Sequence, residues 1–119
     1  MRFGLSEQTI TQIQAVLARC PQVETAVLYG SRAKGNHKPG SDIDLTLHGQ
    51  SLTFAHLLRL MNDLDDLLLP YTIDLSLFQT IANPDLIDHI ERAGIIFYQK
   101  NDKQPVAQTD LSAQPSKDS

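Results

Sequence analysis

The 119-residue sequence has one cysteine, Cys20, no tryptophan and no long apolar run. A single cysteine excludes an internal disulfide, so we expect a reducing compartment and a cytoplasmic protein, with Cys20 a small buried residue. Apolar runs such as 67–69 are far shorter than a bilayer requires, and polar residues interrupt the N-terminus where a secretion signal would be apolar. We therefore expect neither a membrane segment nor a signal peptide.

Positive charge is also scarce, with 10 Lys and Arg residues against 14 Asp and Glu and a net charge of −4. This balance argues against a direct nucleic-acid binder, which usually carries a basic excess. The basic residues Arg32, Lys34 and Lys38 nevertheless gather in one short segment with His37. A local basic loop in an acidic protein suits a small polyanion such as a nucleoside triphosphate. The alternative is a loop that is basic only because it is solvated.

Hydrophobic periodicity predicts alternating helices and strands. We expect helices over 6–19, over 53–69 and from about 84 to 94. We expect strands over 23–29, 42–48, 71–78 and 95–98. This order is typical of an α/β or α+β domain in which helices cover a small sheet, and it leaves the strand directions open. We assign residues 1–99 to this domain and the polar residues 100–119 to a disordered tail.

The helix predicted over 53–69 carries a broad apolar stripe. We expect these residues to face the core: Phe54, Leu57, Leu58, Met61, Leu64 and Leu68. Asp63, Asp65 and Asp66 are expected to form a solvated edge.

Gly30 and Ser31 follow directly on a predicted strand and precede residues that can open a helix. Such a turn presents free backbone N–H groups and the positive end of a helix dipole, which favour phosphate. Gly30 would let a phosphate approach the backbone closely, and the Ser31 hydroxyl can donate a further hydrogen bond. A Gly-Ser pair alone, however, is more often a simple turn.

Three aspartates alternate with apolar residues in predicted strands. Asp42 and Asp44 share a strand face, about 6.5–7 Å apart along the backbone, and can converge on two cations about 3.5–4 Å apart. Asp74 lies between Ile73 and Leu75 in the next strand. If the two strands pair, three carboxylates meet, and a divalent cation would relieve their repulsion. The alternative is a solvated strand face.

The combination is more specific than its parts. Gly30-Ser31, ten further residues, Asp42-Ile43-Asp44 and a later acidic residue in a β-run resemble the signature of the DNA polymerase β-like nucleotidyltransferase superfamily. Residues 30–45 look like the minimal nucleotidyltransferase (MNT) family in particular, and the resemblance runs from about residue 6 to 98. It implies a single minimal polymerase β-like nucleotidyltransferase domain with a small mixed sheet covered by helices.

By this resemblance, Asp42 and Asp44 hold two magnesium ions. Asp74 completes the metal site and helps to activate the attacking hydroxyl. The substrate implied is ATP.

The same resemblance assigns the β- and γ-phosphates to Gly30 and Ser31, and it leaves Arg32 and Lys34 as candidates for neutralising the triphosphate. The four histidines lack the spacing of metal ligands, and we expect surface or strand roles for them: His37, His48, His56 and His89.

MNT proteins are commonly paired with a small helical HEPN protein, and such pairs resemble toxin–antitoxin modules. The MNT antitoxin then transfers AMP from ATP to a tyrosine of the HEPN RNase toxin, within a hetero-oligomer. Two alternatives stay open: nucleotidylation of a small molecule such as an aminoglycoside, with a helical substrate-binding subunit, and a non-catalytic antitoxin that masks its partner sterically. The intact glycine, serine and three aspartates count against the steric antitoxin.

Overall fold

Helices and strands alternate along the computed structural model, which describes residues 2–100. In chain order they are α1 (Glu7–Ala18), β1 (Thr25–Tyr29), α2 (Ser31–Lys34), β2 (Ile43–His48), α3 (Phe54–Asp65), β3 (Ile73–Leu77), the short 3-10 helix η1 (Phe78–Thr80), α4 (Pro84–Ala93) and β4 (Ile95–Gln99). The predicted tail, apart from Lys100, lies outside the described residues. Within those residues, no helix is both long and apolar enough to cross a membrane.

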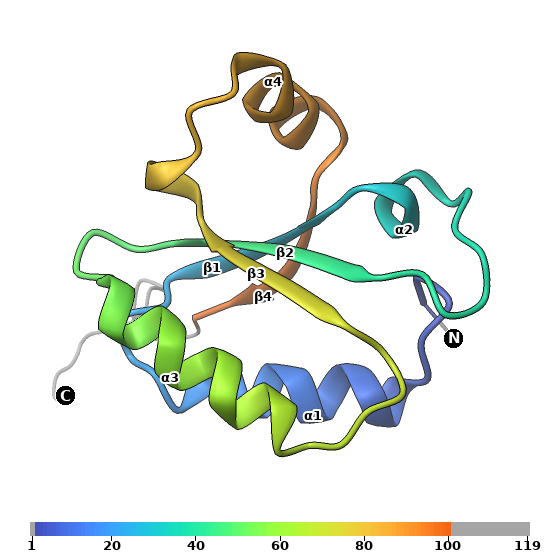
Figure 1. Ribbon diagram of the computed structural model, residues 1–119, viewed down its shortest axis with the longest axis horizontal. Coiled ribbons are helices and arrows are strands. Elements are labelled where there is room, and N and C mark those ends of the chain that lie inside the picture. Colours follow the sequence, from blue (N-terminus) through green and yellow to red (C-terminus); the bar gives the residue numbers. More distant parts are fainter. Residues whose placement is uncertain (1, 101–119) are drawn as a thin grey trace, which may run out of the picture.

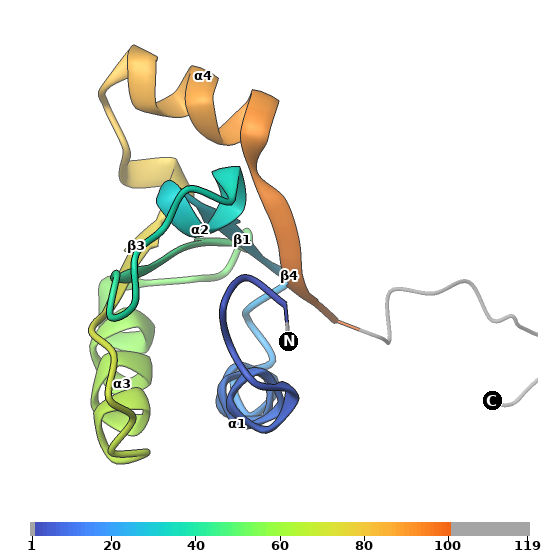
Figure 2. The same ribbon diagram turned by 90° about the vertical axis from the view of Figure 1, so that its right-hand side faces the viewer.

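The four strands form one mixed sheet in the order β3-β2-β1-β4. β2 pairs with β3 in parallel, and β1 pairs with both β2 and β4 in the antiparallel sense. α1 and α3 lie on one side of the sheet and α4 on the other, while α2 follows the end of β1 (Figures 1 and 2). The predicted fold class, a small mixed sheet covered by helices, is confirmed.

The core lies between the sheet and the pair of helices α1 and α3. In β2 every second residue is fully or almost fully buried, namely Ile43, Leu45 and Leu47. Leu75 and Leu77 continue this layer on β3. Because strand side chains alternate between faces, the polar residues between these positions must point to the opposite side, where α4 lies.

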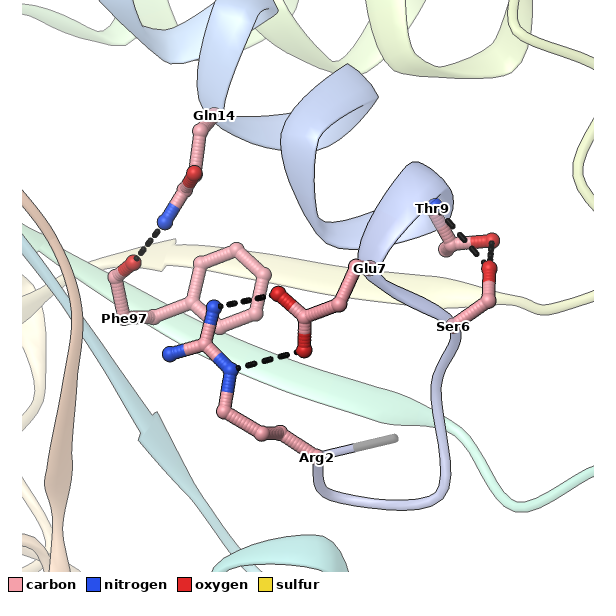
Figure 3. A network of polar contacts seen from close by, with 6 residues as sticks. All are labelled: Arg2, Ser6, Glu7, Thr9, Gln14 and Phe97. Carbon is pink, nitrogen blue, oxygen red and sulfur yellow. Dashed lines mark hydrogen bonds and ion pairs between the residues drawn. The ribbon is translucent and has the colours of Figure 1, made fainter.

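The N-terminal segment is anchored by local hydrogen bonds, which Figure 3 shows. Ser6 caps α1, and its side chain accepts a hydrogen bond from the Thr9 N–H at 3.1 Å. Farther along α1, Gln14 Nε2 donates to the Phe97 carbonyl at 2.9 Å and so ties this helix to β4. The packing of α1 is therefore reinforced by a polar contact across 83 residues of sequence.

The predicted core stripe of α3 is wrong in most of its members. Leu57 and Leu64 are buried, but the other four residues are 40–87% exposed: Phe54, Leu58, Met61 and Leu68. Leu60, which the predicted stripe omitted, is 1% exposed. α3 meets the sheet and α1 through one edge of its broad apolar stripe, the edge that carries Leu57, Leu60 and Leu64. The periodicity of the stripe does not show which edge is buried.

α3 also ends earlier than predicted, at Asp65 rather than near Leu69. Leu68 takes a left-handed conformation with φ 55°, which cannot continue a helix. Two local causes act together. Asp65 and Asp66 place negative charge at the negative end of the helix dipole, and Pro70 disfavours a helical conformation at the residue before it.

Which side of α3 faces the core can be tested by protein stability. Leu60→Ala should lower the free energy of unfolding by about 2–5 kcal/mol, because it leaves a cavity in the core. Leu58→Ala, a matched change on the same helix at a residue that is 50% exposed, should cost about 1 kcal/mol or less. Denaturant unfolding of both variants checks this. Equal losses would show that α3 is rotated differently on the sheet.

Candidate active site

The parallel pairing of β2 with β3 sets two of the predicted site residues side by side. Asp44 is the register partner of Asp74, and Ile43 is that of Ile73. Residues in register share a sheet face, so both carboxylates lie on the side away from the core. Asp42 directly precedes β2 and is exposed. The strand pairing on which the predicted carboxylate cluster depended is therefore observed.

Asp44 is destabilised in its ionised form. Burial raises the pKa of its carboxyl above the usual range, and the negative charges of Asp74 and Asp42 raise it further. Both charged neighbours are thus close enough to act on Asp44. A positive charge close to Asp44 would therefore favour its ionised form.

Gly30 forms the turn between β1 and α2, directly against Asp44. It has φ 78° and ψ −154°, a conformation open to glycine and strained for other residues. A Cβ at this position would clash with Asp44 Oδ2, so the backbone passes within contact distance of the carboxylate. The turn is fixed on both sides: the Gly30 carbonyl accepts from the Lys34 N–H at 3.1 Å, and the Gly30 N–H donates to His89 Nε2 at 3.0 Å.

Three hydroxyl groups continue the site along the same face of the sheet. Tyr29 is the β1 partner of Asp44, and Ser76 Oγ on β3 donates to Thr46 Oγ1 on β2 at 3.0 Å. Burial raises the pKa of the Tyr29 hydroxyl, and a hydrogen bond with Ser76 lowers it in part. The negative charges of Asp74 and Asp44 raise the pKa further. The carboxylates therefore lie beside a largely buried polar floor, with Thr46 fully buried.

Arg32 and Lys34, both predicted to contact the nucleotide, have opposite environments. Lys34 is exposed, whereas Arg32 is only 3% exposed. The Arg32 guanidinium donates twice to the Ser41 carbonyl, at 2.8 and 3.1 Å, and once to the Phe3 carbonyl at 2.7 Å. It also lies over the Tyr71 ring, 5.0 Å from the centroid. Its donors thus fasten the loop before β2 to the N-terminal segment.

A divalent cation would fit the donor set at this site. Among the described residues, no three His, Cys, Asp or Glu side chains stand as a ready-made metal site, so the predicted magnesium site stays a prediction. Carboxylate oxygens are nevertheless the ligands that Mg²⁺ prefers. Burial and the charges of Asp74 and Asp42 raise the pKa of the Asp44 carboxyl, and a bound cation would offset these effects. Asp42, Asp44 and Asp74 would hold the cation.

Four residues of this site did not emerge from the sequence patterns: Tyr29, Thr46, Ser76 and His89. The first three lie at alternating strand positions, so the period-two pattern could have placed them beside the aspartates. His89 carries no such signal, because its contact with Gly30 joins residues 59 positions apart.

Comparison with known proteins agrees with this geometry. The family model for polymerase β nucleotidyltransferases matches residues 11–103, and the chain belongs to this family. Its structure is similar to that of a putative minimal nucleotidyltransferase, with 26% identity, a TM-score of 0.59 and coverage of 80% of this chain and 95% of that one. A comparison with curated proteins finds no match.

Two further solved structures share the fold at lower identity. One is a toxin–antitoxin with AMP-PNP, at 21% identity and a TM-score of 0.60, covering 83% of this chain and 77% of that one. The other is a tri-AMPylated Shewanella oneidensis HEPN toxin in complex with an MNT antitoxin, at 18% identity and a TM-score of 0.60, covering 83% and 76%.

The burial of Asp44 and its repulsion by Asp74 and Asp42 can be tested by their effect on stability. Because the folded-state pKa is raised, stability falls as pH rises from the ordinary aspartate range through that higher pKa. Asp44→Asn should therefore raise the thermal unfolding midpoint at neutral pH in chelator. The gain should vanish in acid, where the wild-type carboxyl is protonated in both states. Asp88→Asn, at an exposed carboxylate on α4, should bring no gain. A lower midpoint for Asp44→Asn would contradict the electrostatic account.

The contacts of Arg32 give a second test. Arg32→Ala should lower the free energy of unfolding by about 3 kcal/mol, because it leaves buried carbonyls without a charged donor. Arg32→Lys should recover only part, since an ammonium group cannot fork between two carbonyls. Lys34→Ala should change stability by no more than about 0.5 kcal/mol. If denaturant unfolding found Arg32→Ala and Lys34→Ala equally stable, Arg32 would not be holding the loop.

Proposed function

We propose that this protein is an antitoxin that transfers AMP from ATP to a tyrosine hydroxyl of a cognate helical HEPN RNase toxin. The observation that carries the proposal is the pairing of Asp44 with Asp74 directly beside the Gly30 turn. Membership of the nucleotidyltransferase family supports the transfer of a nucleotide.

The residues of the site have separable roles in the proposed reaction. Gly30 and Ser31 bind the β- and γ-phosphates, and Lys34 offers an exposed positive charge beside them. Asp42, Asp44 and Asp74 hold two magnesium ions, which when bound stabilise negative charge on the phosphates.

Arg32 contributes indirectly in this proposal, because its guanidinium already binds backbone carbonyls. Asp74 helps to take the proton of the attacking tyrosine hydroxyl. The tyrosine oxygen bonds to the α-phosphorus, the bond to the bridging oxygen breaks, and pyrophosphate leaves.

Two structural neighbours support the choice of acceptor. One neighbour contains a tri-AMPylated HEPN toxin with its MNT antitoxin, and another is a toxin–antitoxin with AMP-PNP. The net charge of −4 also suits a protein acceptor better than a polynucleotide. We further propose that residues 1–99 are the catalytic domain and that the protein acts in the cytoplasm, where its single free Cys20 would stay reduced.

Intact-mass spectrometry of the co-encoded helical partner tests this function. With ATP and magnesium, the purified protein should add one or more AMP units to the partner and block its RNase activity, since a bulky anion would repel RNA phosphates. Asp42→Asn and Asp44→Asn should abolish the addition, as should excess chelator. The matched variant Asp65→Asn, at an exposed carboxylate on α3, should remain active.

The alternatives give different results in the same assay. A partner that is inhibited but unmodified would replace the proposal with a steric antitoxin. AMP transfer to an aminoglycoside and not to the partner would point to a small-molecule nucleotidyltransferase.

A further inference from the structure

One histidine reaches the glycine turn from a helix far along the chain. His89 Nε2 accepts the hydrogen bond of the Gly30 N–H at 3.0 Å. Because a backbone N–H can only donate, Nε2 carries no proton in this contact. The imidazole also meets the Tyr29 ring edge-on, with centroids 6.3 Å apart. His89 therefore contacts both residues that join β1 to the turn.

The position of this imidazole is set by helix packing. Ile90, the next residue of α4, is 4% exposed, so this part of the helix is pressed onto the sheet. A Cβ on Gly94 would lie 2.6 Å from Val27 Cγ1, which shows how closely the end of α4 approaches β1. At the other end, Asn83 caps α4 and accepts from the Asp85 N–H at 2.9 Å. A helix fixed at both ends holds the ring at the turn.

The contact matters because Gly30 is the residue that can most easily lose its conformation. Glycine has more accessible backbone conformations than any other residue. A ligand that binds only one of these conformations must therefore overcome a larger loss of backbone entropy. On its carbonyl side Gly30 is fixed by the Lys34 N–H, within α2. On its N–H side, the only acceptor that residues 2–100 offer to Gly30 is His89 Nε2.

We propose that His89 is a positioning residue that presets the Gly30–Ser31 turn for the triphosphate. This inference rests on the proposed function, because it takes the turn as the phosphate site. His89 touches neither the transferred group nor the metal in this role. It keeps the turn in its binding conformation, so that less ordering remains to be done when ATP arrives.

Two substitutions of His89 distinguish positioning of the turn from other roles of this side chain. His89→Ala removes the acceptor, and His89→Gln replaces it with an amide oxygen of similar reach. Asp88→Ala serves as the matched control, because Asp88 is the neighbouring residue on α4 and its side chain forms an exposed ion pair with Arg92 at 2.8 Å, away from the turn. Calorimetry measures ATP binding with magnesium, and transfer assays measure KM and kcat.

We expect His89→Ala to weaken ATP binding about fivefold, the effect of one lost hydrogen bond. The KM for ATP should rise with kcat at saturating ATP unchanged, because the turn is still ordered once ATP is bound. His89→Gln should restore most of the affinity, and Asp88→Ala should match the wild type. The thermal unfolding midpoint of His89→Gln should stay close to that of the wild type.

Three results would overturn the inference. Unchanged affinity in His89→Ala would show that the turn needs no support. Tighter binding would show that the imidazole competes with phosphate for the Gly30 N–H. Equal losses in His89→Ala and His89→Gln would show that ring packing, and not the hydrogen bond, matters. Each of these presumes that the wild type binds ATP; if it binds none, the proposed function itself fails.

Discussion

The parallel register of β2 and β3 is the constraint on which the site depends. It sets Asp44 beside Asp74, and burial together with the charge of Asp74 makes the ionised form of Asp44 unfavourable. The favourable energy comes from the other face of the same strands, where Ile43, Leu45 and Leu75 pack against α1 and α3. Because strand side chains alternate, the core that fixes the register also fixes the distance between the carboxylates. A shift by one residue would bury the aspartates and expose the leucines.

Arg32 shows how a charged residue near a binding loop can serve the architecture. Its guanidinium draws the Ser41 and Phe3 carbonyls together and lies over Tyr71. These residues belong to three separate segments, which meet next to the start of β2. Within residues 32–38, Arg32 is thus a buried cation that organises the loop, whereas other cations, such as Lys34, are exposed and accessible.

Sequence patterns predicted much of this fold because its strands alternate so regularly. The period-two pattern of β2 and β3 identified both strands and the face that carries Asp44 and Asp74. The apolar stripe of α3 is broad, so periodicity could not select Leu60 over Leu58; only contact with the sheet and α1 decides which is buried. His89 and Arg32 act through hydrogen bonds to backbone atoms of distant segments. Every residue except proline has the same backbone donor and acceptor, so no pattern of side chains predicts such contacts.

The place of β3 at the edge of the sheet has a consequence for the size of the acceptor. Its Asp74 is exposed, with β2 on one side and no strand of residues 2–100 on the other. Figure 1 shows α4 on the opposite face of the sheet from α3. A carboxylate enclosed in a deep cleft admits only molecules that fit through its entrance. A carboxylate on an open rim can instead be reached by a side chain that projects from the surface of a folded protein.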